Sequence, residues 1–227
     1  MQGRTPLAQR ELPDYTKGEE CFNFVSHVVG GGLAVLMLIL CVIRAVQRGN
    51  AAAIVAAVVY GLSLVSVYTV SSVYHGLRPI TAKKVMQVLD HCTIYFLIFG
   101  SYLPILLCSI RRESPVTAWV LFGVISAITV LAVTFTAIDL EKYRALSMVC
   151  YVGLGWCIVF AAPVALRAIP LPGVLWLLFG GIAYTVGAVL YGLGSRRRYM
   201  HSVFHFFVLA GSVCHIIAVW DVLIEYL

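Results

Sequence analysis

The sequence predicts an all-α membrane protein built as a bundle of seven transmembrane helices. Of its 227 residues, 61% are apolar and only 11% are charged, and the mean hydropathy is +0.95. In soluble domains about a quarter of all residues are charged, so this composition excludes an ordinary soluble protein. Seven apolar runs are each long enough to cross a bilayer as a helix, which takes about 20 residues. A chain of this length is expected to form one compact domain.

The elements follow one another with short connections. Residues 1–21 form a short polar arm, and residues 22–227 form the seven-helix transmembrane domain. No cleavage site follows the first apolar run, so we expect it to stay in the membrane. Charged residues, proline and glycine end the successive helices in the stretches "RAVQRGN", "GLRPITAKK", "RRESP", "DLEKYR", "RAIPLPG" and "GSRRRY". The expected spans are roughly 22–43, 51–75, 88–110, 116–138, 145–166, 173–194 and 200–222.

Basic residues predict the orientation. The arm and the second, fourth and sixth connections carry 11 lysines and arginines, whereas the other three connections carry 5. Because basic residues concentrate on the cytoplasmic side, we expect a cell-membrane protein with its N-terminus in the cytoplasm and its C-terminus outside. The 11 are Arg4, Arg10, Lys17, Arg78, Lys83, Lys84, Lys142, Arg144, Arg196, Arg197 and Arg198. They lie between apolar runs rather than on one face, which argues against a nucleic-acid partner despite the net charge of +6.

Ionisable residues inside membrane spans are costly, so they are the first functional candidates. His75 closes the second span, Asp90 opens the third, and His201 and His205 lie in the first two turns of the seventh. With the expected orientation, all four lie near the cytoplasmic face. The sequence therefore predicts that three helices bring these groups together at one depth.

The histidines have the spacing of a zinc site. His201 and His205 are four residues apart and share one helical face. A zinc ion held by three protein ligands and a water is typical of a catalytic site, and His75 is the natural third ligand. Ser71 lies one turn before His75 on the same face. We expect one Zn²⁺ per chain, although imidazole also suits other transition metals.

Three further histidines are less informative. His215 lies ten residues after His205, about 15 Å along the helix, and cannot reach the same ion. His27 and His91 also lie near the cytoplasmic level. For His27 and His215 we expect packing or hydrogen bonding rather than a functional role. His91 points about 100° away from Asp90, so it is expected to face largely away from the bundle interior if Asp90 faces inward.

Structural roles also explain each site candidate taken alone. The histidine pair suits interhelical hydrogen bonding, and Ser71 suits close helix packing. Asp90 suits the first turn of a helix, where the dipole favours a carboxylate, or an ion pair with Lys83 or Lys84. The joint pattern favours the metal site.

The motifs "SSVYHG", "LDHCTIYFLIFGSYLP" and "HSVFHFFVLAGSVCH", with the opening "EECFNFVSHVVGGG", resemble the hemolysin III family, which belongs with the progestin and adipoQ receptors. The resemblance extends from about residue 19 to the end. It implies a seven-helix bundle with zinc on His75, His201 and His205, and with Asp90 holding a water at the metal. The polar arm is far shorter than in the animal receptors, so no ligand-sensing role is expected for it.

Three functions are compatible with these residues. The first is a zinc-dependent hydrolase of membrane lipid amides or esters, acting in lipid homeostasis, with Asp90 as general base and Ser71 as an orienting hydroxyl. The second is a membrane sensor in which zinc is structural. The third, a channel or haemolytic pore, ranks last because the polar groups gather at one end of the bundle. The sequence leaves the oligomeric state open.

Overall fold

The structure, a computed structural model, describes residues 4–194 and 197–225. Every regular element in these two ranges is helical, and no strand occurs in them. In chain order the elements are η1 (Leu7–Gln9), α1 (Lys17–Gln47), α2 (Ala51–Gly76), α3 (Ile80–Pro104), η2 (Ile105–Ile110), α4 (Arg111–Glu113), α5 (Pro115–Ile138), α6 (Arg144–Gly155), η3 (Cys157–Ala161), α7 (Ala162–Ala168), α8 (Leu171–Gly194) and α9 (Met200–Glu225).

Local sequence signals explain where the helices begin. At α1, the Thr16 hydroxyl accepts a hydrogen bond from the Glu19 N–H, and the Glu19 carboxylate accepts one from the Thr16 N–H, which is a capping box. The side chain of Asn50 caps α2, and that of Ser114 caps α5 with proline at the next position. Gly49, with φ of 65°, forms the turn between α1 and α2.

These elements make seven helical segments long and apolar enough to cross a membrane, as the sequence predicts. The third is continuous through α3, the π-helical turn η2 and α4. The fifth is broken between α6 and α7 by the 3₁₀ turn η3. At this break the Tyr102 hydroxyl accepts a hydrogen bond from the Ile158 N–H at 3.1 Å and donates to the Leu154 carbonyl at 2.9 Å. The backbone groups released by the break are thus satisfied from α3.

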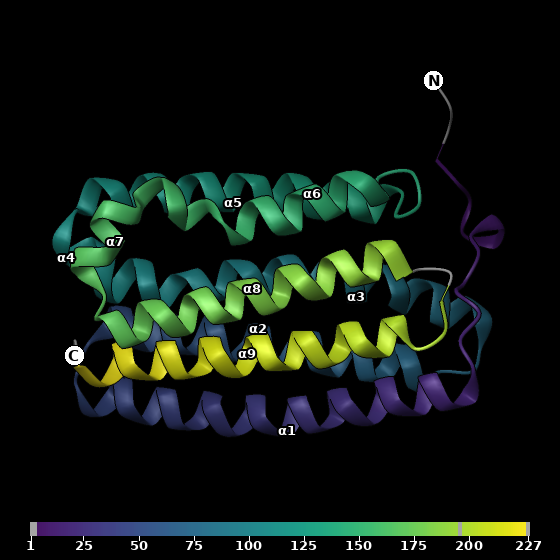
Figure 1. Cartoon of the computed structure of the whole chain (residues 1–227), viewed down its shortest axis with the longest axis horizontal. Helices are drawn as coiled ribbons and strands as arrows, with labels where there is room; N and C mark the ends of the chain where they lie inside the picture. Colours follow the sequence, from purple (N-terminus) through teal and green to yellow (C-terminus); the bar gives the residue numbers. More distant parts are fainter. Residues whose placement is uncertain (1–3, 195–196, 226–227) are drawn as a thin grey trace.

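The helices form layers that run side by side along the molecule (Figure 1). Helix α1 packs on α2 and α9, α8 packs on α9, and α3 packs on both α2 and α5. Small residues permit the closest approaches. At Gly100 of α3, an added Cβ atom would lie 2.4 Å from the Ser63 hydroxyl oxygen of α2. The outer surface is apolar, with Val116 at 74% and Phe160 at 91% exposed, as expected for helices that face lipid.

The polar arm crosses the end of the bundle where α2 ends and α9 begins (Figure 1). Arg10 is 3% exposed and donates to the Ile138 carbonyl at 3.0 Å. Asp139 accepts hydrogen bonds from the backbone N–H groups of Thr5, at 2.7 Å, and of Lys142. Burial alone would raise the pKa of Asp139, but these hydrogen bonds outweigh it and lower the pKa from 3.8 to about 2. The arm is therefore docked on the loop between α5 and α6.

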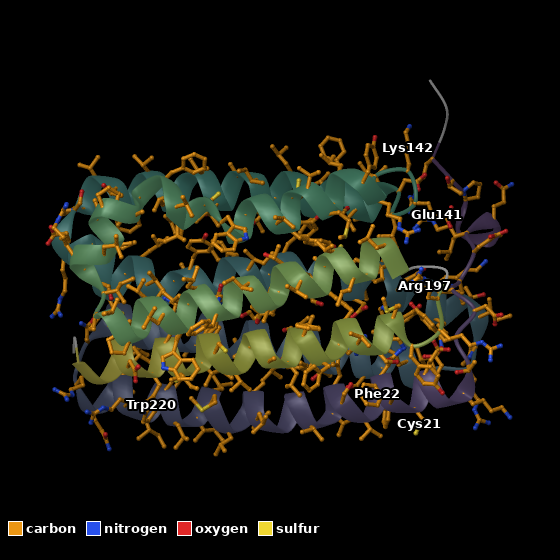
Figure 2. The ribbon with its side chains drawn as sticks, in the orientation of Figure 1. Cys21, Phe22, Glu141, Lys142, Arg197 and Trp220 are labelled. Carbon is orange, nitrogen blue, oxygen red and sulfur yellow. The ribbon has the colours of Figure 1, made fainter. Side chains whose placement is uncertain are left out.

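Charged side chains mark this same end of the bundle. Glu141, Lys142 and Arg197 lie beside the arm, whereas Trp220 lies toward the opposite end (Figure 2). Arg196, which contributes to the basic count of the sixth connection, lies outside the described residues. The cytoplasmic placement of this end remains a prediction from the distribution of basic residues.

Candidate metal centre

Three histidines converge at the arm-covered end of the bundle. Helix α2 places His75 in its last turn, and α9 places His201 and His205 in its first two turns. The Nε2 atom of His201 lies 3.3 Å from Nε2 of His75 and 2.9 Å from Nε2 of His205. One ligand atom from each residue lies within 4.8 Å of the other two, so this histidine cluster could hold a metal ion. The convergence predicted from the sequence is confirmed.

The donor set fits a transition metal. Four ligands placed tetrahedrally about 2.0–2.1 Å from a zinc ion lie about 3.3 Å from one another, close to the two separations in the histidine cluster. His75 is 4% exposed and His205 is 1% exposed. Buried imidazole nitrogens that face one another need a shared proton or a cation between them. Three neutral imidazoles suit zinc and also copper, iron or nickel, so these residues do not fix the identity of the metal.

Asp90 and Ser71 lie on the wall of the cavity beside the cluster. Asp90 comes from α3 and is 8% exposed, while Ser71 comes from α2, one turn before His75, and is 1% exposed. The Ser71 side chain lies beside the Asp90 carboxylate. Both residues line the same internal cavity as His201 and His205. The five residues singled out from the sequence are thus gathered into one region.

The structural roles considered for Asp90 are wrong. Helix α3 begins at Ile80, not near residue 88, because its first turns are polar and lie outside the apolar run. Asp90 therefore lies in the third turn, beyond the strong field of the helix N-terminus. Lys83 pairs with Glu20 instead, and Lys84 donates to the Ala8 carbonyl at 2.9 Å. Neither lysine neutralises Asp90.

His27 belongs to the surroundings of the cluster. Its ring, carried by α1, stacks on the ring of His205 with centroids 3.8 Å apart and forms a T-shaped contact with the ring of Tyr68. His27 is 3% exposed and also lines the cavity. The stack holds one face of His205, so α1 supports the cluster without contributing to the three-histidine group.

The structure contradicts the expectation for His91 and agrees with that for His215. His91 lines the cavity together with Asp90, so the expectation that it faces away is wrong. The Nδ1 atom of His91 lies 2.8 Å from the Gln87 carbonyl. His215 packs against Tyr184, away from the histidine cluster, as the helical rise predicts.

Two glutamates of α1 contact the site although the sequence pattern did not single them out. Glu20 contacts His75, with Oε2 2.6 Å from Nδ1, and its other oxygen contacts Lys83. Glu19 accepts a hydrogen bond at 2.5 Å from the backbone N–H of Tyr199, two residues before His201. A sequence signal was present, because Glu20 and His27 are seven residues apart on one face of a mainly apolar helix.

Tyr15 of the arm covers the cluster. Its ring stacks on that of His201, with centroids 4.9 Å apart and planes 21° apart, and lies 5.8 Å from the ring of His75. Burial and the nearby carboxylates of Glu20 and Asp90 raise the pKa of Tyr15, so the phenol stays neutral. The arm thus shields the cluster from the aqueous end of the bundle.

An internal cavity of about 360 Å³ extends from the cluster into the bundle. His205 and His215 both line it, and they are about 15 Å apart along α9. Beyond the histidine end its walls are mainly apolar, with contributions from α3, α6, α8 and α9. Ile98, Ile105 and Leu177 are examples. The volume lies in the range of small-molecule sites, and the lining suits a long apolar group.

The sequence matches the Haemolysin-III related family over residues 15–216. The chain belongs to this family. The haemolysin III match covers all seven spans in whole or in part, and therefore includes the histidine cluster, Asp90 and Glu20. Together with the seven apolar helices, it indicates a multi-pass membrane protein.

Curated relatives agree with this family. The chain is 34% identical to Hemolysin-3 of Bacillus cereus over 194 residues, which cover 86% of this chain and 87% of the relative. It is 28% identical to a Hemolysin-3 homolog of Bacillus subtilis, covering 87% and 91% of the two chains. It is also 25% identical to the human Monocyte to macrophage differentiation factor, covering 73% and 69%.

Proposed function

We propose that this haemolysin III family protein is a zinc-dependent hydrolase of membrane lipid amides or esters, with one zinc ion held by the histidine cluster. One observation carries the proposal: three converging imidazoles and a buried carboxylate, Asp90, lie at one end of an apolar cavity of about 360 Å³. A hydrolase needs such groups where a carbonyl can be placed, and a lipid needs an apolar chamber for its chain.

Each residue has a definite role in this proposal. Zinc, when bound, supplies an activated water at neutral pH and polarises a carbonyl oxygen. His75, His201 and His205 would hold the ion through the Nε2 atoms that face one another. Asp90 accepts a proton at its carboxylate and returns it to the leaving group. Ser71 orients that carboxylate through its hydroxyl. His27 and Tyr15 fix the rings of His205 and His201 by stacking.

The cavity favours a substrate with a long apolar chain. Its mainly apolar walls extend about 15 Å from the cluster along α9, which is room for part of an acyl chain. The cluster lies near one end of the bundle, so we expect it at the depth where lipid head groups meet the hydrocarbon. An amide or ester bond at that depth, as in a ceramide-like or acyl lipid, would reach Asp90 while its chain occupies the cavity.

The first test is metal content. Protein purified in detergent, wild type beside His205→Ala, is assayed by elemental mass spectrometry. We expect about one zinc per chain in the wild type and none in the variant. His215→Ala is the matched control, because it removes an imidazole from the same helix but outside the cluster, and it should keep its zinc. A wild-type protein without metal contradicts the proposal.

The second test is turnover. Wild type and Asp90→Asn are incubated with a panel of ceramides and acyl lipids, and released fatty acid is measured. The variant should keep its zinc and lose about 10²–10⁴-fold in rate, the usual contribution of a general base. If the zinc-loaded wild type releases no fatty acid from any lipid, the hydrolase is wrong.

One observation favours a second candidate, a sensor or regulator with structural metal. The cluster joins α2 to α9 and is covered by the arm, so a metal there would also hold the bundle together. This alternative predicts that Asp90→Asn keeps both zinc and biological function, whereas the hydrolase predicts that it keeps zinc alone. The channel is not proposed, since the cavity walls beyond the cluster are mainly apolar.

A further inference from the structure

Glu20 gives the two ring nitrogens of His75 different environments. Nδ1 lies 2.6 Å from Oε2 of Glu20, whereas Nε2 faces His201 at 3.3 Å. The His75 side chain is fully buried, so water does not compete for Nδ1. A carboxylate only accepts hydrogen bonds, so Nδ1 carries the proton and Nε2 presents its lone pair to the centre of the cluster.

Lys83 fixes Glu20 in turn. The ammonium group contacts Oε1, the oxygen that His75 does not use, and lies 5.3 Å from the centroid of the Tyr74 ring. The side chain of Glu20 is 22% exposed and that of Lys83 13% exposed. The chain Lys83–Glu20–His75 therefore links α3, α1 and α2 and uses both carboxylate oxygens. A carboxylate held at both oxygens has little freedom to turn away from Nδ1.

We propose that Glu20 is a positioning residue for the metal site, which holds His75 in the tautomer and ring orientation that a metal requires. Outer carboxylates of this kind raise ligand basicity, and their loss typically weakens metal binding 10–100-fold. The proposal rests on the metal-binding part of the proposed function. It assigns a role to α1, which contributes none of the three histidines, and accounts for a glutamate placed beside a buried imidazole.

Substitutions at Glu20 and Lys83 distinguish this role from that of a simple ion pair. In Glu20→Gln the amide has one oxygen, which the ammonium of Lys83 attracts, and its NH₂ group then faces Nδ1. That arrangement favours the opposite tautomer, with the proton on Nε2. Removing the lysine frees the amide oxygen for Nδ1–H. Glu20→Gln should therefore weaken metal binding, and adding Lys83→Met should restore part of it.

The test measures zinc affinity in the full-length protein. Wild type, Glu20→Gln, Lys83→Met and the double variant are purified in detergent, loaded with zinc and titrated against a chelator. We expect a 10–100-fold weaker affinity for Glu20→Gln. A several-fold recovery is expected in the double variant, and Lys83→Met alone should weaken zinc binding less than Glu20→Gln does, because it removes the group that orients the carboxylate but keeps the carboxylate itself. Glu113→Gln is the matched control, since it breaks a carboxylate–cation contact with Arg167 at the opposite end and should bind zinc normally.

The outcomes separate the two levels of the proposal. Zinc bound equally by wild type and Glu20→Gln overturns the role of Glu20 and leaves the site intact. No zinc in the wild type overturns the site itself. If Glu20→Gln does not fold, Glu20→Asp replaces it, because it keeps the charge but is too short for the 2.6 Å contact and should also weaken binding. Histidine ¹⁵N NMR of the zinc-free protein reports the tautomer directly, and protonated Nδ1 is expected in the wild type and in part of the double variant, but not in Glu20→Gln.

Discussion

Adding a methyl group at Gly100 tests whether close contact between α2 and α3 holds the bundle in register. A Cβ at this position would lie 2.4 Å from the hydroxyl oxygen and 2.8 Å from the Cβ of Ser63, with the next atom, in Tyr60, at 3.4 Å. Ordinary contact begins at about 3.4 Å, so Gly100→Ala requires the Ser63 hydroxyl to move by about 1 Å and the two helices to separate by about 0.6 Å. These helices carry Asp90, Ser71 and His75.

Two opposing contributions determine how Gly100→Ala changes the free energy of unfolding. Overpacking of a tight interior site costs about 1–3 kcal/mol. Replacing glycine by alanine within a helix returns about 0.5–1 kcal/mol. Gly123→Ala on α5 isolates the second part, because Gly123 is exposed and a Cβ there meets no atom within 4 Å. Gly100→Ala should therefore be less stable than Gly123→Ala by about 1–3 kcal/mol in the free energy of unfolding.

A second substitution, Ser63→Gly, tests whether steric contact with Ser63 causes the expected loss of stability. Ser63→Gly removes both close atoms and costs one hydrogen bond within α2, to the Tyr60 carbonyl. In that background Gly100→Ala should behave like Gly123→Ala. The assay is reversible unfolding in mixed detergent micelles, and the double-mutant cycle should give a coupling of about 1–3 kcal/mol. A coupling below about 0.5 kcal/mol, the usual limit for independent sites, would refute steric contact at this point.

Three further predictions concern the helix break, the arm and its anchor. Tyr102→Phe leaves the Ile158 N–H without its acceptor and should lower the free energy of unfolding by about 1–3 kcal/mol; an unchanged melting temperature contradicts this. Tyr15→Ala removes a stacked ring worth about 0.5–1.5 kcal/mol, so a chelator should strip zinc roughly 2–10-fold faster, and equal rates would show that the arm does not shield the cluster. The pKa of Asp139 is lowered from 3.8 to about 2, so its hold on Thr5 is complete above about pH 4 and is lost as the pH falls toward 2. Proteolysis of the arm should accelerate over that range, and Asp139→Asn should show fast cleavage at every pH.

The sequence by itself determined the number of spans and the meeting of the main site residues. Insertion depends on summed transfer free energies over about 20 residues, a local quantity that composition gives directly. His75 at the end of one span and His201 at the start of another must share a depth, because antiparallel helices alternate direction. That argument needs only chain order and span length, and the structure confirms it.

The start of α3 and the orientation of His91 could not be predicted from the sequence. The start of α3 was placed too late because its polar first turns carry no hydropathy signal, and this error made a helix-dipole role for Asp90 reasonable. The orientation of His91 was misjudged for a related reason, since one angle on a helix does not reveal how wide the facing cavity is.

Only the tertiary structure decided how α1 and the arm contribute to the site. The contact of Glu20 with His75, the stack of His27 on His205 and the ring of Tyr15 over His201 join residues at least 55 positions apart in the chain. Such contacts depend on the rotation of each helix about its axis and on side-chain packing between helices. In lipid the hydrophobic effect does not set that rotation, since every apolar face is equally satisfied by lipid. Close packing at small residues and a few buried polar contacts set it, and these are properties of pairs of helices rather than of any single segment.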